Sequence, residues 1–123
     1  GLESTLIASY AMLLGRGGFY DDTSNWFWGS VVGGDANKGT NAGDQNVVNE
    51  VQRYETLTTN TEVRNKYARC YEGIARANTT LRLLPNAAAD VTAANKTRLE
   101  GEARFLRALY YFELKRLYNN TPY

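Results

Sequence analysis

Histidine is absent from this chain of 123 residues, and cysteine occurs only once, at Cys70. Without histidine, the chain lacks the side chain that most often shuttles protons near neutral pH and binds transition metals. A single cysteine can form neither an internal disulfide nor a Cys-x-x-Cys metal site, so we interpret Cys70 as a small buried apolar residue. No nucleophile–base pair or metal site can be assembled from these residues, and we expect neither enzymatic activity nor a cofactor.

Excess charge of one sign and long apolar runs are also lacking. The 14 basic and 13 acidic side chains give a formal charge of only +1, so nucleic acid is not an expected partner. No run approaches the roughly 18 consecutive apolar residues that span a bilayer, and nothing at the start resembles a secretory signal peptide. We expect a fragment of a longer protein, because the chain starts at Gly1 rather than methionine and ends directly after a long helical pattern.

Apolar residues recur at helical spacing in four segments, and no alternating pattern indicates a strand. The predicted helices cover residues 2–14, 44 to about 58, 62–84 and 92–118. The short connection between the last two predicts that they pack antiparallel as a hairpin. The sequence therefore predicts an all-α fold of tetratricopeptide-like antiparallel helical hairpins, with a long loop rich in aromatic residues, glycine and asparagine between the first two helices.

Helix boundaries are predicted from capping residues and helix breakers. Asp44, Thr61 and Thr92 should each cap a helix, because their side-chain oxygens can accept a hydrogen bond from an amide of the first turn. Pro85 should end the helix over 62–84, because proline cannot continue it. The first helix should end at three glycines, Gly15, Gly17 and Gly18.

The last predicted helix has an unusually broad apolar surface. One face carries Leu99, Ala103, Leu106, Tyr110, Leu114 and Leu117, and Phe105, Leu109 and Phe112 widen it. Such a helix needs cover on more than one side. Gly101 lies inside it, where glycine costs about 1 kcal/mol relative to alanine, and a close helix crossing would explain its presence.

Between the first two helices, residues 19–43 gather glycine, asparagine and aspartate around aromatic side chains, which indicates a structured loop with a short helix around Trp26. Aromatic rings stack on sugars, while amide and charged groups hydrogen-bond to hydroxyls. The candidate glycan-binding residues are Trp26, Trp28, Asp35, Lys38, Gln45 and Tyr54. Tyr20, Asn25, Asn37, Asn41 and Asp44 belong to the same aromatic and polar set. Alternatively, Trp26-Phe27-Trp28 is the hydrophobic plug of a loop folded over the helices.

Three sequence blocks resemble one family. The run GEARFLRALYYFEL at residues 101–114 resembles the GEARFLRAxYYFxL signature of SusD/RagB proteins. Residues matching the family's W-x3-Y-x2-I-x-R-x-N helix, with tyrosine for tryptophan, are Tyr67, Tyr71, Ile74, Arg76 and Asn78. Residues 35–39 with Asp44-Gln45 are similar to a loop of one branch of the family, although Gly33-Gly34 stand where that branch has serine and aspartate.

This resemblance implies a glycan-binding lipoprotein of the outer membrane, in which helical hairpins form a scaffold and loops bind the glycan. Residues 1–123 would be its N-terminal helical part. The implied partners are an oligosaccharide or polysaccharide and a TonB-dependent outer-membrane transporter of the SusC type. The protein would be exposed on the cell surface and would meet the membrane only through a lipidated cysteine upstream of Gly1.

Two functions stay open at this point. In the first, the protein captures an oligosaccharide and delivers it to the transporter. In the second, the chain is a helical interaction scaffold that docks a partner transporter without touching glycan, as the broad apolar face of the last helix suggests.

The charged residues of the signature are interpreted as structural. These residues are Glu102, Arg104, Arg107, Glu113 and Arg116. Their spacing allows Glu–Arg pairs with one another on the last helix, and also with Arg69, Glu72 or Arg76 of the preceding helix. Glycoside hydrolysis is disfavoured, because Glu102 and Glu113 are 11 residues apart on one helix, roughly 16 Å along its axis.

Overall fold

The computed structural model describes residues 1–15, 20–22, 26–89 and 91–122, and these residues form helices and loops without a strand. The elements, in chain order, are α1 (Leu2–Tyr10), η1 (Ala11–Leu14), η2 (Trp26–Val31), α2 (Asn46–Gln52), α3 (Thr61–Leu83), η3 (Leu84–Asn86) and α4 (Ala93–Tyr118). The predicted all-α class is confirmed. The predicted positions Gly17, Gly18 and Asn25 lie outside the described residues.

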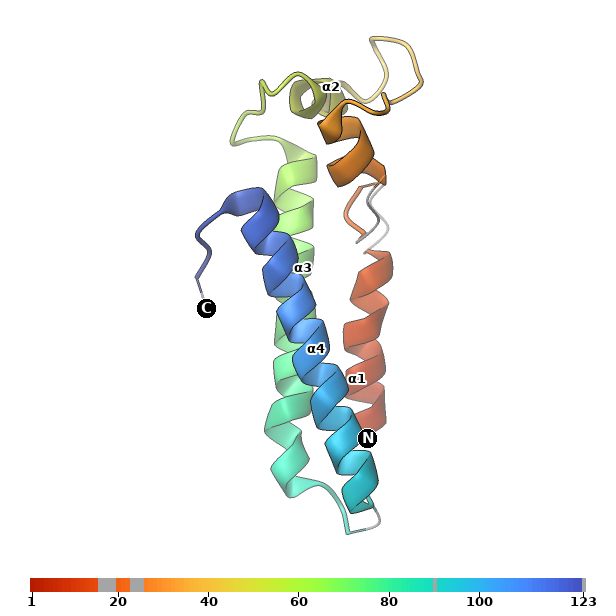
Figure 1. The fold of residues 1–123 in the computed structure, drawn as a ribbon, viewed down its shortest axis with the longest axis vertical. Helices are drawn as coiled ribbons and strands as arrows, with labels where there is room; N and C mark the ends of the chain where they lie inside the picture. Colours follow the sequence, from red (N-terminus) through yellow and green to blue (C-terminus); the bar gives the residue numbers. More distant parts are fainter. Residues whose placement is uncertain (16–19, 23–25, 90, 123) are drawn as a thin grey trace.

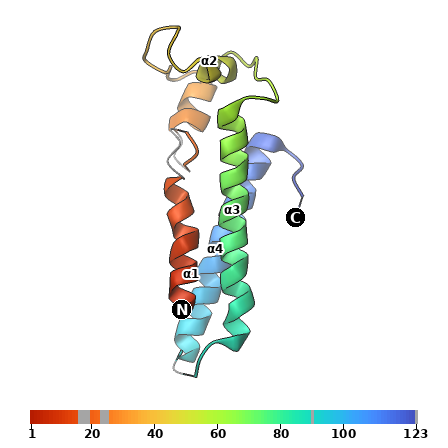
Figure 2. The same cartoon turned by 180° about the vertical axis from the view of Figure 1, so that it is seen from behind.

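Helices α3 and α4 lie side by side and run in opposite directions, and α1 lies against both (Figures 1 and 2). The hairpin predicted over 62–84 and 92–118 is therefore confirmed, with each boundary within one residue of its predicted place. The apolar stripes of these helices meet in a first core, which includes the fully buried Cys70. Its other buried residues are Leu6, Met12, Ile74, Leu84, Leu99, Ala103, Leu106, Tyr110 and Leu114.

The close crossing of α3 and α4 lies at Gly73, and the prediction that Gly101 marks it is wrong. A Cβ atom at Gly73 would lie 2.5 Å from Cε2 of Tyr110, so only a hydrogen atom fits there. Gly101 instead faces outward, and a Cβ atom placed on it would meet nothing within 4 Å. The fully buried Tyr110 ring thus takes the space that a side chain at position 73 would need.

Side chains of α3 and α4 hold the carbonyls at the end of α1. The hydroxyl of Tyr110 donates to the carbonyl of Ser9 at 2.6 Å, and Arg76 Nη1 donates to the carbonyl of Ala8 at 2.9 Å. In return, the hydroxyl of Ser9 donates to the carbonyl of Gly73 at 3.1 Å. The last carbonyls of a helix have no partner within it, so these bonds satisfy them and fix α1 on the hairpin. Tyr110 and Arg76, which both lie in the sequence blocks that resemble the family, therefore have structural roles.

Helix α3 begins at Thr61, one residue earlier than predicted, and its cap is therefore Asn60 rather than Thr61. Asn60 is the capping residue, because its Oδ1 accepts from the amides of the second and third residues of α3, at 3.0 and 3.2 Å. Its Nδ2 donates to the carbonyl of Val47 and to Glu50 Oε2, at 2.9 and 2.8 Å, which ties α2 to the start of α3. Thr61 cannot make these bonds as the first helical residue, whereas the predicted cap Thr92 is confirmed on α4.

Helix α2 starts later than predicted, and Asp44 does not cap it. The Oδ1 atom of Asn41 accepts from the backbone amides of residues 43 and 44, each at 3.1 Å, and this holds Asp44 in a turn. The residue before the helix is Gln45, which has a left-handed φ of 46° and no capping side-chain bond. The local Asx turn therefore displaces the helix start to Asn46.

Four Glu–Arg ion pairs form along single helices: Glu72–Arg76, Arg98–Glu102, Glu100–Arg104 and Glu113–Arg116. Of these four, only Glu113–Arg116 is a pair that the sequence predicted. The pair between α3 and α4 is a different one, Lys66 with Glu113, at 3.1 Å and with both side chains buried. Arg69 is also buried, and its guanidinium donates to the carbonyl of Met12 rather than to a carboxylate. Backbone carbonyls accept from both buried cations, that of Met12 in η1 from Arg69 and that of Asp22 from Lys66.

Only part of the broad face of α4 is covered. Helices α1 and α3 bury the stripe that contains Ala103 and Leu106, as the pattern predicts. Phe105 and Phe112 are 64% and 57% exposed on the outer side of the helix. An outer apolar stripe of α4 therefore has no cover from the part of the chain described here.

Candidate functional site

Residues 26–58 fold over the end of the bundle at which α3 begins, and we call this segment the loop cap (Figure 1). A second core holds it in place, and the buried residues of that core are Tyr20, Phe27, Trp28, Val31, Val48 and Val51. Val63 of α3 and Leu117 of α4 pack against this cluster, which joins the loop cap to the hairpin. The loop cap is therefore a packed structure on a rigid support, as a binding site requires.

The two tryptophans of the loop cap have different surroundings. Trp28 is 8% exposed, its Nε1 donates to the carbonyl of Tyr20 at 2.6 Å, and its ring meets Phe27 edge to face. Trp28 and Phe27 thus occupy the core, where the plug interpretation puts them. Trp26 is 46% exposed, and its ring stacks on Tyr20 at a centroid distance of 5.4 Å. Trp26 is therefore the tryptophan whose ring a ligand can reach.

A polar hollow of about 420 Å³ lies in the loop cap, between the segment after η2 and the end of α2. Asp35, Asn37, Gln52 and Tyr54 line it, together with residues 31–34 and Ala36. Asp35 and Asn37 are exposed, so their polar groups can be reached from solvent. The hollow combines carboxylate and amide groups with one aromatic ring, which are the groups that recognise sugar hydroxyls and sugar faces.

Tyr54 owes its position to an unusual backbone conformation. Helix α2 ends at Gln52, and the prediction that it continues to about Thr58 is wrong, because Tyr54 has a left-handed φ of 60°. The hydroxyl of Tyr54 donates to the carbonyl of Val32, which fixes the ring against the opposite wall of the hollow. The side chain is nevertheless 75% exposed. A residue without the flexibility of glycine is strained at such a φ, and strain of this kind often accompanies binding sites.

The remaining candidates, Gln45 and Lys38, bond to Tyr20 and to Asp44, respectively. The hydroxyl of Tyr20 donates to Gln45 Oε1, and Lys38 Nζ donates to the carbonyl of Asp44. Burial, followed by the negative charges of Glu62 and Asp44, raises the pKa of Tyr20 above its ordinary value of 10.0, so its hydroxyl stays a donor into more alkaline solution than an exposed tyrosine. These bonds connect the aromatic core to the turn that precedes α2.

The structure thus brings Asp35 and Tyr54 together in one hollow, while Trp26 and Gln45 both contact Tyr20. Gln52 was missed in the sequence, because a single glutamine on a predicted helix carries no signal of its own. The signal that would place Gln52 in the hollow is the turn of the chain at Tyr54, and sequence periodicity does not indicate this turn.

Neither a metal-binding group of side chains nor a membrane-spanning helix is present in the described part of the chain. There, no group of three or more histidine, cysteine, aspartate or glutamate side chains is arranged to hold a metal ion. In the same residues, no helix is long and apolar enough to cross a membrane.

Comparison with known proteins gives one family. The SusD-like family described as starch-binding associating with outer membrane matches residues 5–123. No curated protein and no solved structure matches the chain. The matched region contains α3, α4 and the whole loop cap, and all of α1 apart from its first residues. The chain therefore belongs to the SusD-like family of starch-binding proteins that associate with the outer membrane.

Proposed function

We propose that this protein captures an oligosaccharide at the cell surface through its loop cap and delivers it to a TonB-dependent transporter of the SusC type. Its family is described as starch-binding and associated with the outer membrane. The observation that carries the proposal is the polar hollow, in which Asp35, Asn37 and Gln52 surround an exposed tyrosine ring. The protein acts by binding and is not an enzyme.

Each part of the hollow has a role in this proposal. The ring of Tyr54 stacks on the apolar face of a sugar, because its hydroxyl is held by Val32 and the ring cannot swing away. The carboxylate of Asp35 accepts hydrogen bonds from hydroxyls, and the amide of Gln52 both donates and accepts. Trp26 adds a second stacking surface farther along the loop cap, while Trp28 keeps the cap folded.

Isothermal titration of the full-length protein with malto-oligosaccharides tests the binding role. We expect Tyr54→Ala and Trp26→Ala each to weaken binding about tenfold, because each removes an aromatic face. Phe105→Ala is the matched control, since its ring is 64% exposed on the outer face of α4. If neither loop-cap variant weakens binding more than the control, the loop cap is not the site.

Three broader parts of the proposal concern the whole protein. Residues 1–123 form the N-terminal helical domain of a longer chain, a lipid on an upstream cysteine anchors that chain at the cell surface, and the transporter receives the glycan from it. Mass spectrometry of the lipidated N-terminus and purification of the native complex test these parts. A membrane-extracted protein without lipid, or without a co-purifying transporter, would contradict them.

A second candidate function is a docking scaffold, and the outer face of α4 favours it. Gly101, Phe105, Ala108 and Phe112 follow one another at steps of four, three and four residues, which is the spacing of a helix-packing seam. Two exposed rings alternate with two small residues, so a partner helix could insert between the rings. Phe105→Glu with Phe112→Glu would then abolish co-purification with the transporter and leave malto-oligosaccharide binding by the loop cap unchanged.

A further inference from the structure

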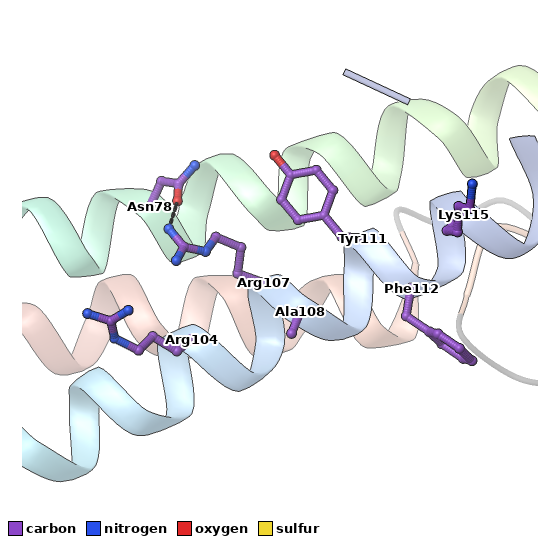
Figure 3. Close-up of a pocket in the computed structure, with 7 residues that line it drawn as sticks. All are labelled: Asn78, Arg104, Arg107, Ala108, Tyr111, Phe112 and Lys115. Carbon is purple, nitrogen blue, oxygen red and sulfur yellow. Dashed lines mark hydrogen bonds between the residues drawn. The ribbon is translucent and has the colours of Figure 1, made fainter. Parts of the chain in front are cut away.

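A second concave surface lies on the α3–α4 hairpin and shares no residue with the loop cap. Its volume is about 720 Å³, and its lining includes Asn78 of α3 and, from α4, Arg104, Arg107, Tyr111, Phe112 and Lys115 (Figure 3). The stripe of α4 that lines it carries the conspicuous run of arginines in the GEARFLRALYYFEL block. We refer to this surface as the hairpin groove.

Two cations of the hairpin groove have only neutral partners. Arg107 Nη1 donates to Asn78 Oδ1 at 3.0 Å, and Figure 3 shows the guanidinium turned toward this amide. Lys115 Nζ donates to the side-chain oxygens of Asn119 and Asn120, at 2.9 and 3.0 Å. Within residues 1–15, 20–22, 26–89 and 91–122, neither cation forms an ion pair with a carboxylate.

The acidic residues of α4 are held away from these two cations. Glu100 pairs with Arg104 at 2.7 Å, at one end of the groove. Glu102 pairs with Arg98 on another side of the helix, and Glu113 is buried against Lys66. The hairpin groove therefore carries a net positive charge, in a chain whose overall charge is close to neutral.

The two cations without a carboxylate partner among the described residues, Arg107 and Lys115, are far enough apart along α4 to contact two separate carboxylates of one ligand. Arg104 and Arg107 are about 4.5 Å apart along the helix axis, and Arg107 and Lys115 are about 12 Å apart, at a rise of 1.5 Å per residue. Tyr111 lies between them in sequence and turns its ring toward α3, near Tyr71. The groove therefore alternates charged groups with an aromatic side chain.

We propose that the hairpin groove binds an acidic oligosaccharide, with one carboxylate on Arg107 and another on Lys115. A guanidinium binds a carboxylate through two parallel hydrogen bonds, and its contact with Asn78 already orients Arg107. The amide of Asn78 is placed to bond to a neighbouring hydroxyl, and the Tyr111 ring supplies an apolar side to the groove. This inference rests on the proposed function only in that the ligand is a saccharide.

An acidic peptide segment would also be attracted by this charge. A saccharide is favoured because a fixed guanidinium, a side-chain amide and a tyrosine ring converge in one groove, and this set suits a ring that carries hydroxyls and a carboxylate. A peptide segment would need mainly the charges and the apolar area of Phe112.

The test is isothermal titration of the full-length protein with oligogalacturonate, with malto-oligosaccharide of equal length and with polyglutamate of equal charge. We expect oligogalacturonate to bind at least about tenfold more tightly than polyglutamate, and more weakly as salt is added. Arg107→Ala and Lys115→Ala should each weaken its binding about tenfold, because a charge-assisted bond is lost. Arg64→Ala removes an exposed cation from another part of α3 and should have no effect.

Equal binding of polyglutamate would overturn the proposal in favour of a peptide-docking surface, and so would absence of oligogalacturonate binding. Oligogalacturonate binding that is lost in Tyr54→Ala but not in Arg107→Ala would place the acidic ligand in the loop cap and also overturn it. Malto-oligosaccharide binding reports separately on the loop cap. If that binding is absent while the Arg107-dependent binding persists, the proposed loop-cap site fails and the hairpin groove stands.

Discussion

Gly73 of α3 and Tyr110 of α4 interlock where the two long helices cross. A Cβ atom on Gly73 would lie 2.5 to 2.7 Å from three atoms of the Tyr110 ring. The hydroxyl of the same ring donates to the carbonyl of Ser9 in α1. Because Gly73 has no side chain, α1, α3 and α4 can all meet at this ring. The hairpin that supports both the loop cap and the hairpin groove depends on this contact.

Gly73→Ala should destabilise the protein by about 1–3 kcal/mol, because the new methyl group must displace a packed ring. Gly101→Ala is the matched control in the same hairpin. It should stabilise the protein by about 1 kcal/mol, because alanine favours the helix and meets nothing at that position. Chemical denaturation of both variants measures the two free energies of unfolding. Destabilisation of equal size at both positions would contradict the crossing described here.

The stability of the fold should decline at alkaline pH. Burial raises the pKa of Tyr110 from 10.0 to about 12 and raises the pKa of Tyr118 as well. Between pH 10 and 12 the unfolded chain has released the Tyr110 proton while the folded chain retains it, so stability is complete below pH 10 and falls as the pH rises. Tyr110 alone should contribute a loss on the order of 1–3 kcal/mol.

Urea denaturation at pH 8 to 11.5 measures this loss. Tyr110→Phe should flatten part of the decline, although it also removes the bond to Ser9 and lowers stability at every pH. Tyr54→Phe, at a side chain that is 75% exposed, should leave the decline in place. If the free energy of unfolding falls just as steeply with pH in Tyr110→Phe, ionisation of Tyr110 does not cause the decline.

Removal of one partner from the buried ion pair Lys66–Glu113 should strongly lower the free energy of unfolding. Glu113→Gln leaves the ammonium of Lys66 buried, and removal of one partner from such a pair typically costs 3–5 kcal/mol. Burial lowers the pKa of Lys66, with the charge of Glu113 acting in the opposite direction, so the single variant should also release the lysine proton more easily. Replacement of both residues, as Lys66→Met with Glu113→Leu, should recover much of the stability.

A double-mutant cycle by thermal and urea unfolding measures the coupling between the two residues. Glu102→Gln is the control, because the Glu102–Arg98 pair is partly exposed and such pairs contribute about 0–1 kcal/mol. Additive effects of the two buried substitutions would contradict a direct interaction.

Asn60→Ala should lower the free energy of unfolding by about 2 kcal/mol. The substitution removes the cap of α3, worth about 1 kcal/mol, and two further bonds from a residue that is only 2% exposed. Hydrogen exchange should show the loss concentrated in α2 and the first turn of α3. Thr61→Ala, at the neighbouring position, should cost much less, and a larger effect there would restore the capping role that the sequence suggested for it.

The sequence predicts the helices well because their periodicity is local. Leu99, Leu106 and Tyr110 fall on the buried stripe of α4 without knowledge of any partner. The crossing point could not be predicted in this way, since Gly73 and Gly101 look alike in sequence and differ only in what lies opposite them. A glycine inside a helix signals a close contact only when another element reaches it.

The candidate site was predictable in composition and not in geometry. Aromatic and amide residues in the loop indicate sugar recognition, but Trp26 and Trp28 are nearly adjacent and only packing decides which one is buried. Gln52 and Tyr54 meet Asp35 because the chain reverses after α2, through a left-handed residue that no sequence pattern marks. The arginines of the hairpin groove are visible in the sequence, but only the contacts show that Arg107 and Lys115 bond to side-chain amides rather than to carboxylates.

Hydrogen–deuterium exchange of the full-length protein, with and without malto-oligosaccharide, tests most directly whether the loop cap holds the glycan. Protection confined to residues 31–37 and 52–54, with α3 and α4 unchanged, is the result that this account predicts. Absence of protection in the loop cap, while the ligand protects another part of the protein, would contradict it.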